Sequence, residues 1–270
     1  MLSKGVKMMK IKDIAQIIEK DFPLNLAFDR DNVGLLIGDR EEEVKKILLT
    51  LDVDEAVVNE AITCGANLII SHHPLMFFKT SRLTEADSEQ RAIRLMIKNG
   101  IALYSAHTNL DAASGGLNDY MASLLDMKNA EVIDVVSTEN GIHGFGRMAV
   151  LEEPVSLKEL MDKVIKIFNA DGLRYAGELD AKISKLAINT GGGADILPFA
   201  VNEGCDAVIT GDIKYNGYLD CLSGDMCVID LMHYDSEQIV MNFFENYFMH
   251  MNVDIVKSKT NVNKIKTYTV

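Results

Sequence analysis

The sequence has few basic residues for its length. Its 270 residues include 27 lysines and arginines against 40 aspartates and glutamates, which gives a formal net charge of −13 and an isoelectric point near 4.9. Phosphate backbones and anionic lipid surfaces repel such a chain, so the composition argues against a general nucleic-acid binder or an anionic-membrane binder. A small anionic substrate is still compatible with it, because a bound metal ion can dominate the local field.

Cysteine pairs and long apolar runs are also missing. The four cysteines include no CxxC pair, and each lies in or beside an apolar segment: Cys64, Cys205, Cys221 and Cys227. This pattern indicates buried reduced thiols rather than disulfides. No apolar run reaches the length of a membrane span, and the N-terminal residues lack the apolar core of a signal peptide. We therefore expect a cytoplasmic protein that does not enter a membrane.

The regular feature of the chain is an alternation of strand-like and helix-like segments. Short apolar runs have the length of buried strands, at 45–53, 66–71, 101–106 and 206–210. Amphipathic segments have helical spacing, at 54–64, 156–169 and 237–249. This alternation predicts an α/β fold with mostly parallel sheets. The turn-rich residues 135–147 are a candidate seam between two halves.

Two stretches of the chain resemble each other. Residues 46–71 align without a gap to residues 185–210, at a constant offset of 139 positions that matches Gly65 to Gly204. Chance similarity between strand–helix–strand units is the alternative explanation. We favour an internal duplication, which predicts two similar α/β lobes whose functional ends can face one another.

Histidines follow the predicted strands in three places. The three groups are His72 with His73, His107 with Asp111, and His233 with Glu237. Ligands of open α/β sheets bind beyond the carboxyl ends of the strands, and imidazole with carboxylate suits zinc, iron, manganese or nickel. Adjacent residues of a strand point to opposite faces, so His72 and His73 share one site only if the chain turns there, which Pro74 favours.

This ligand set is too large for one tetrahedral zinc ion. Five or six donors suit two ions that share a carboxylate and a water, at a separation of roughly 3.5–4 Å. Glu237 is expected to begin the helix 237–249, where the helix dipole favours a carboxylate, and helix capping alone is the simpler explanation of that residue. His143 and His250 are interpreted as structural or surface residues.

Two further segments are candidate substrate contacts. Gly191, Gly192 and Gly193 follow a predicted strand, and such a loop can present backbone N–H groups to an anion. The loop matches neither a Walker motif nor GxGxxG, and a plain flexible loop explains it equally well. Residues 31–39 have the pattern of a turn, a strand and a second turn, and Asp31 and Asn32 at its start can line a site.

Several blocks together resemble a known family. They are "LAFDRDNVGLLIGD", "LLTLDV", "GANLIISHHPLMF", "SAHTNLDAASGGLND", "GFGRMAVLEEP", "ITGDIKYNGYLD" and "LMHYDSE", and they span nearly the whole chain. The sequence is similar to the dinuclear metal-centre proteins labelled GTP cyclohydrolase 1 type 2 homologues, whose eukaryotic relatives are called interacting-factor-three-like. The resemblance implies two related lobes with a dinuclear metal site in the cleft between them, and a ring-shaped homohexamer.

The resemblance also assigns roles to residues. It places the metal ligands at His72, His73, Asp111, His233 and Glu237, with His107 beside them, and it implies two divalent ions per chain, either iron, zinc or manganese. The chain departs from the family pattern where many relatives carry a histidine. Here that segment reads Lys214, Tyr215 and Asn216, so Lys214 becomes a candidate substrate contact.

The resulting hypothesis is a dinuclear-metal hydrolase with a metal-activated water as nucleophile and His107 as general acid and base. By resemblance it opens the purine ring of GTP. Two alternatives stay open: a two-metal phosphoesterase or nucleotide hydrolase, and a non-catalytic metal-binding scaffold. We expect an N-terminal lobe of residues 1–128 and a C-terminal lobe of residues 129–270, the second completing the site with residues 231–237.

Overall fold

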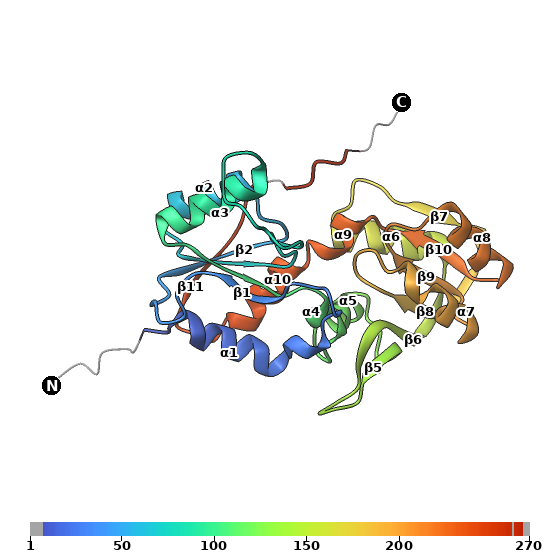
Figure 1. Cartoon of the computed structure of the whole chain (residues 1–270). Helices are drawn as coiled ribbons and strands as arrows, with labels where there is room; N and C mark the ends of the chain where they lie inside the picture. The colour runs from blue at the N-terminus through green and yellow to red at the C-terminus, as the bar shows by residue number, and fades with distance from the viewer. Residues whose placement is uncertain (1–7, 261, 267–270) are drawn as a thin grey trace. The chain divides into compact units, whose positions relative to one another are not determined.

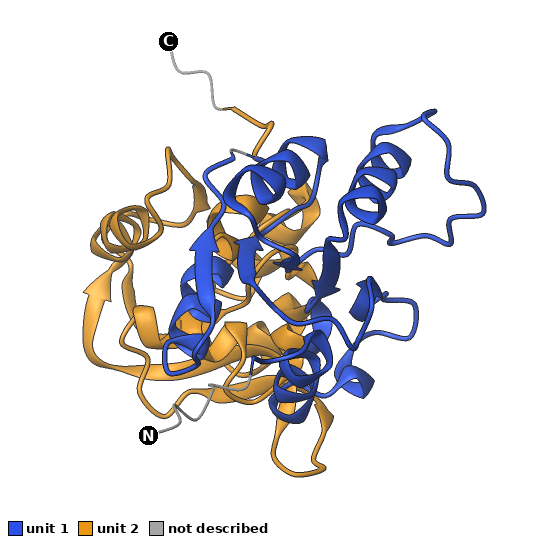
Figure 2. Ribbon diagram, turned by 90° about the vertical axis from the view of Figure 1, so that its left-hand side faces the viewer, with its two compact units in different colours: residues 1–109, 240–262 blue, residues 110–239, 263–270 orange. Residues whose placement is uncertain are grey.

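The chain folds into two compact units. The computed structural model describes residues 8–260 and 262–266 (Figure 1). Unit 1 comprises Met1–Asn109 and Val240–Val262, and unit 2 comprises Leu110–Ile239 and Asn263–Val270 (Figure 2). Among the described residues, no helix is long and apolar enough to cross a membrane.

Unit 1 is built on a five-stranded sheet with the strand order β1-β4-β3-β2-β11. Its elements are α1 (Ile11–Asp21), η1 (Leu24–Leu26), β1 (Gly34–Ile37), β2 (Lys46–Thr50), α2 (Glu55–Cys64), β3 (Leu68–Ser71), α3 (Ser88–Asn99), β4 (Ala102–Ser105), α10 (Val240–Phe248) and β11 (Asp254–Lys257). Strands β11, β2, β3 and β4 run parallel, and β1 pairs with β4 antiparallel. Each strand predicted in this unit is present.

Helices cover both faces of this sheet. Leu48, Ile69 and Leu103 lie in one row across β2, β3 and β4, and they pack against α2 and α3. Helices α1 and α10 lie on the opposite side of the sheet (Figure 1). Helix α2 begins where the Asp54 side chain accepts hydrogen bonds from two backbone N–H groups, and it ends at Gly65 in the left-handed conformation.

Unit 2 is built on a six-stranded sheet with the order β5-β6-β8-β9-β10-β7. Its elements are α4 (Thr108–Ala112, which crosses the unit boundary), α5 (Leu117–Leu124), β5 (Glu131–Ser137), β6 (His143–Ser156), α6 (Leu157–Phe168), β7 (Arg174–Ala176), β8 (Lys182–Ile188), η2 (Ala194–Ile196), α7 (Leu197–Asn202), β9 (Ala207–Thr210), α8 (Tyr215–Ser223), β10 (Cys227–Asp230) and α9 (His233–Glu237). Strands β8, β9 and β10 are parallel, and β5, β6 and β7 join antiparallel.

The two sheets repeat one pattern, as the sequence alignment predicts. In unit 1 Ile47 pairs with Leu68 across β2 and β3. The residues 139 positions later, Leu186 and Ala207, pair across β8 and β9 in the same parallel register. In both units a third parallel strand follows, and an antiparallel strand closes that side of the sheet. The shared register supports the duplication.

Three details differ from the sequence expectations. Residues 135–147 are not a seam, because β5 and β6 pair across them within the unit 2 sheet. The division into units falls at residues 109 and 110 rather than 128 and 129, because α5 contacts β6 and β8, and α10 and β11 return to β2. The helix expected over 237–249 is two helices, so Glu237 ends α9 instead of beginning a helix.

The cysteines are free thiols, as the sequence predicts. Cys205, Cys221 and Cys227 are buried, and Cys64 is partly buried. Burial raises the pKa of Cys205 and of Cys221 to about 11, so both stay protonated and unreactive near neutral pH.

The Glu60 carboxylate fastens the end of β11 to α2. It accepts hydrogen bonds from the N–H groups of Lys259 and Thr260 and from the hydroxyls of Ser258 and Thr260. Burial raises the pKa of Glu60, but these hydrogen bonds outweigh it and hold the pKa below the ordinary 4.5. The stabilisation is therefore present above pH 4.5 and is lost as the pH falls through the lowered pKa.

Replacing Glu60 with glutamine tests this stabilisation. We expect wild-type unfolding temperature to fall more steeply than that of Glu60→Gln as the pH drops below 4.5. Thermal unfolding followed by circular dichroism between pH 3 and 7 measures it. Glu245→Gln, which removes a surface ion pair with Lys257, is the control and should follow wild type. Parallel curves for Glu60→Gln and wild type would contradict the assignment.

Candidate metal centre

Three histidines of unit 1 gather at the carboxyl edge of its sheet. His72 and His73 directly follow β3, and His107 follows the neighbouring parallel strand β4. One nitrogen from each of the three rings lies within 4.8 Å of the other two. The ring centroids are 5.2 to 5.4 Å apart. The parallel register therefore brings His107 beside His72 and His73, which lie 34 or more positions away in the sequence.

The Nδ1 atom of each ring is held by an oxygen. His72 Nδ1 lies 2.7 Å from the Ala106 carbonyl oxygen, and His73 Nδ1 lies 2.7 Å from an oxygen of Asp52. His107 Nδ1 lies 2.9 Å from Asp31 Oδ2. An oxygen at Nδ1 places the proton there, which makes Nε2 the nitrogen that can bind a metal. This arrangement is the one that metal-binding histidines ordinarily have.

Asp31 is the more buried of the two carboxylates that hold these rings. Its side chain is 2% exposed, and it also accepts hydrogen bonds from the N–H and hydroxyl of Thr108. Burial raises the pKa of Asp31, but the hydrogen bonds from His107 and Thr108 outweigh it, so the pKa lies below its ordinary value. Asp31 is thus a carboxylate at neutral pH. The neighbouring Asn32 donates its side-chain N–H to the Met76 carbonyl at 2.7 Å and holds the loop that follows Pro74.

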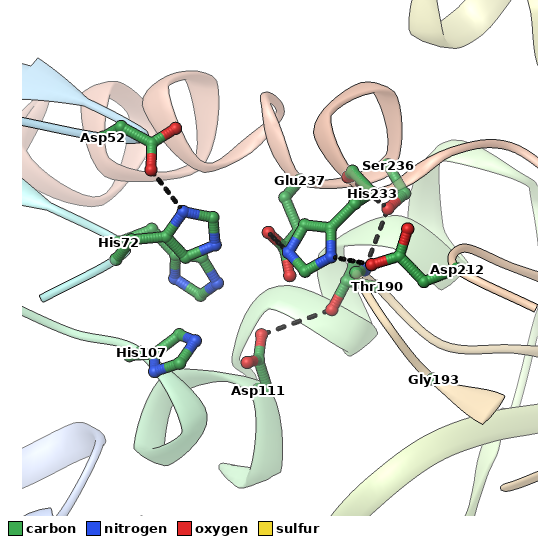
Figure 3. A network of polar contacts seen from close by, with 12 residues as sticks. Asp52, His72, His107, Asp111, Thr190, Gly193, Asp212, His233, Ser236 and Glu237 are labelled. Atoms are coloured by element: carbon green, nitrogen blue, oxygen red, sulfur yellow. Dashed lines mark hydrogen bonds and ion pairs between the residues drawn. The ribbon is translucent and has the colours of Figure 1, made fainter. Parts of the chain in front are cut away.

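Unit 2 gathers its own candidate ligands at the carboxyl edge of its sheet. His233 follows β10, and its Nδ1 lies 2.8 Å from Asp212, which follows β9 (Figure 3). Its Nε2 lies 2.9 Å from Glu237 Oε2, one helical turn later on α9. Asp212 and Met232 both have positive φ angles, of 57° and 67°. Such backbone is uncommon outside glycine, and here it turns the chain so that Asp212 and His233 meet.

Asp111 belongs to the same unit. It lies on α4, is 7% exposed, and its Oδ1 accepts a hydrogen bond from the Thr190 hydroxyl at 3.2 Å (Figure 3). The Asn118 side chain joins the Asp111 carbonyl to the Thr190 N–H, at 3.1 and 3.0 Å. Asp111 is therefore fixed to the loop that follows β8, at the edge of the sheet from which His233 also projects.

The glycine loop after β8 makes room for the ligands. A Cβ on Gly191 would lie 1.9 Å from Glu237 Oε1. The Gly191 N–H donates to Ser236 Oγ at 2.8 Å, and the Gly193 N–H donates to Thr210 Oγ1 and to the Gly191 carbonyl, both at 3.0 Å. Two of the three predicted anion donors are thus engaged within the protein, and an anion contact at Gly192 stays a prediction.

Other predicted residues lie elsewhere. Lys214 is exposed at the start of α8, where it lines a cavity of about 610 Å³ together with Asp212. His143 is 6% exposed, accepts a hydrogen bond from the Ser114 N–H and lies 3.1 Å from the Glu139 carbonyl, which is a structural role. His250 is exposed.

Three carboxylates hold histidine rings, and sequence reasoning missed two of them, Asp52 and Asp212. Each comes directly after a buried strand, which is where a ligand-orienting acid is expected in an α/β sheet. The internal repeat carries a further signal, because the offset of 139 that relates the two units matches Asp212 to His73. Either observation makes Asp212 a candidate site residue.

Fold and site define a class: a mixed α/β protein of two related units, with three histidines at the carboxyl edge of the unit 1 sheet and one histidine with carboxylates at that of unit 2. The sequence model of the family Duf34/NIF3 (NGG1p interacting factor 3) matches residues 9–264. The chain belongs to this family, which confirms the resemblance read from its motifs.

Relatives and solved structures agree with this assignment. A GTP cyclohydrolase 1 type 2 homolog of Clostridium perfringens is 41% identical over 235 residues, which cover 86% of this chain and 88% of the relative. One from Clostridium acetobutylicum is 37% identical over 264 residues, 96% of this chain and 98% of the relative. A hypothetical protein of Staphylococcus aureus has a TM-score of 0.89 at 29% identity, over 97% of this chain and 100% of that one. Reduced HcgD from Methanocaldococcus jannaschii has a TM-score of 0.80 at 27% identity, over 95% and 100%.

Proposed function

We propose that the protein is a dinuclear-metal-dependent hydrolase. In this proposal two histidines of unit 1 and three residues of unit 2 together hold two divalent ions, which are iron, zinc or manganese. The ligands are His72, His73, Asp111, His233 and Glu237. The observation that carries the proposal is that every ligand histidine has its Nδ1 held by an oxygen, which orients Nε2 for metal binding.

The donor chemistry fits divalent transition metals. Three neutral imidazoles and two carboxylates match zinc, iron and manganese, and no thiolate is among the donors. The acids that hold His73 and His233, Asp52 and Asp212, add negative charge that favours a bound cation. A scaffold that only stores metal needs the same donors, so the reaction itself has to be tested separately.

Two bound ions would supply an activated water as nucleophile and would stabilise the developing oxyanion. The protein residue assigned to proton transfer is His107. Asp31 holds its Nδ1 and stays ionised, so the Asp31–His107 pair can keep one tautomer and accept a proton at Nε2. His107 is 19% exposed at the side chain, which leaves it open to a substrate.

The proposed substrate is GTP, because the curated relatives carry the name GTP cyclohydrolase 1 type 2 homolog. The reaction would open the imidazole ring of the purine by hydrolysis and release its C8 carbon as formate. We also propose that the protein is cytoplasmic and that it forms a homohexamer. Analytical ultracentrifugation would measure the oligomeric state.

Metal content tests the site. We expect anaerobically purified wild type to contain about two ions per chain by mass spectrometry. His72→Ala and Glu237→Gln should each lose at least one ion, because each substitution removes a ligand from a different unit. His250→Ala changes an exposed histidine outside the site and should retain both ions. One ion or none in wild type, or full occupancy in both ligand variants, would refute the dinuclear site.

Turnover tests the reaction. Metal-replete wild type is incubated with GTP, and formate, pterin and inorganic phosphate are measured. Formate release that is lost in His107→Gln, with metal content unchanged, is the expected result. Phosphate without formate would instead establish a phosphoesterase. No turnover of any nucleotide by the fully metallated protein would favour the scaffold.

A further inference from the structure

A cavity of about 610 Å³ lies in unit 2 beside the candidate ligand His233. Its wall is formed by the start of α7, the end of that helix and one side of α8. The apolar part consists of Ala194, Leu197, Pro198, Val201 and Cys221. This volume lies within the range of about 300–1,000 Å³ that is usual for small-molecule sites.

The rim of the cavity is polar, and its side chains are not used by the fold. Asp195, Asn202, Lys214, Asn216 and Asp220 line it. Within residues 8–260 and 262–266, none of these five side chains forms a hydrogen bond or an ion pair. Other charged residues of this unit do pair at similar exposure, such as Lys158 with Asp162 and Lys163 with Asp126. Lys214 stays unpaired although carboxylates share its cavity.

One residue joins this cavity to the metal centre. Asp212 lines the cavity, and its Oδ2 lies 2.8 Å from His233 Nδ1. Figure 3 shows Asp212 between the loop after β9 and the His233 ring. A molecule bound against Leu197 and Val201 would therefore be separated from the candidate ligand His233 by the Asp212 side chain alone.

The chemistry of the rim selects a kind of ligand. Carboxylate oxygens accept hydrogen bonds, so Asp195 and Asp220 suit a group with adjacent N–H donors. The apolar wall suits the flat face of a ring. Lys214 suits a carbonyl or an anionic substituent on the same molecule.

We propose that this cavity binds the ring of the substrate, and that the ring is a planar heterocycle with an amino-amidine edge, as in guanine. Asp195 and Asp220 recognise the N–H edge, and the wall at Leu197 and Val201 contacts the ring. The inference rests on the proposed function, because it names the part of the substrate that is held beside the metal ligands.

Guanosine and inosine binding tests the proposal. The two nucleosides differ by the exocyclic amino group, and neither has a phosphate that could bind a metal. We expect zinc-loaded wild type to bind guanosine at least tenfold more tightly than inosine by calorimetry, because inosine leaves a carboxylate without one donor. In Asp195→Asn/Asp220→Asn this preference should disappear.

A bulky substitution at the cavity provides a second test of the proposal. Asn216 is exposed on α8 and lines the cavity, so Asn216→Trp should block guanosine without disturbing the core. Leu219→Trp is the matched control, since Leu219 is 46% exposed on the same helix and does not line the cavity. Wild type that fails to bind guanosine, or binds inosine equally well, overturns the proposal. So does guanosine binding by Asn216→Trp with wild-type affinity.

Metal content is measured in the same samples. It should be identical in wild type and all three variants, because none replaces a ligand or a residue that holds one. Failure of the cavity proposal leaves the metal content at two ions. Failure of the proposed function appears as missing metal or as absent turnover of GTP, and guanosine binding by the same protein still decides the cavity.

Discussion

Gly191→Ala will weaken metal binding by the proposed unit 2 ligands by about 100-fold or more. The added Cβ would lie 1.9 Å from Glu237 Oε1 and 3.4 Å from His233 Nε2, so the carboxylate has to leave its place. Gly191 also has a φ of +62°, where a side chain costs roughly 1–2 kcal/mol. Removing a residue that holds a ligand typically lowers metal affinity about 10–100-fold, and displacing the ligand itself should lower the affinity further. Zinc titration against a competing chelator measures the affinity.

Gly192→Ala separates this effect from a general change in the loop. A Cβ at 192 would meet its nearest neighbour, Asp212 Oδ2, at 3.5 Å, which is ordinary van der Waals contact. Gly192 is exposed and does not have a positive φ. We expect zinc affinity within about threefold of wild type for this variant. Equal affinities for Gly191→Ala and wild type would mean that Glu237 is not a ligand.

The strands and the candidate ligands were predictable because both depend on local patterns. A buried strand of a parallel sheet is a short apolar run, and the polar residues that follow it lie at one edge of the sheet. His72, His73 and His233 each come within three residues of such a run. The similarity of the two sheets was predictable because residues that pair across β2 and β3 align in sequence, at the offset of 139, with residues that pair across β8 and β9.

Features that depend on distant packing were not predictable. The apolar spacing over 237–249 continues through Ile239 and Val240, yet the residues before and after that point belong to different units. The chain therefore breaks the helix between Glu237 and Val240. The acids that hold His73 and His233 were missed for the same reason. Which of many aspartates reaches a ring nitrogen depends on how neighbouring strands align.

Arg147→Met will destabilise the protein by about 3–5 kcal/mol, because it removes a buried cation and leaves its hydrogen-bond acceptors without a donor. Arg147 is 1% exposed, and all five of its N–H donors are used. Two bonds reach the Asp119 carboxylate at 2.7 and 2.9 Å, and three reach the carbonyls of Gly144, Gly146 and Ala113. Methionine fills similar space but leaves these acceptors without a donor. Urea denaturation measures the change.

The same arginine should affect the candidate metal centre, because its partners flank the proposed ligand Asp111. Asp111 lies on α4, Ala113 directly follows that helix, and Asp119 lies on α5. By bonding to Ala113 and Asp119, Arg147 on β6 holds the α4–α5 segment against the unit 2 sheet. Loss of the fastening should lower metal occupancy as well as stability. Arg94→Met removes an exposed ion pair with Glu85 and should cost less than about 1 kcal/mol with full occupancy. If Arg147→Met is as stable as Arg94→Met, the buried hydrogen bonds of Arg147 make no net contribution to stability. If Arg147→Met is destabilised but has normal metal content, Thr190 and Asn118 alone hold Asp111 in place.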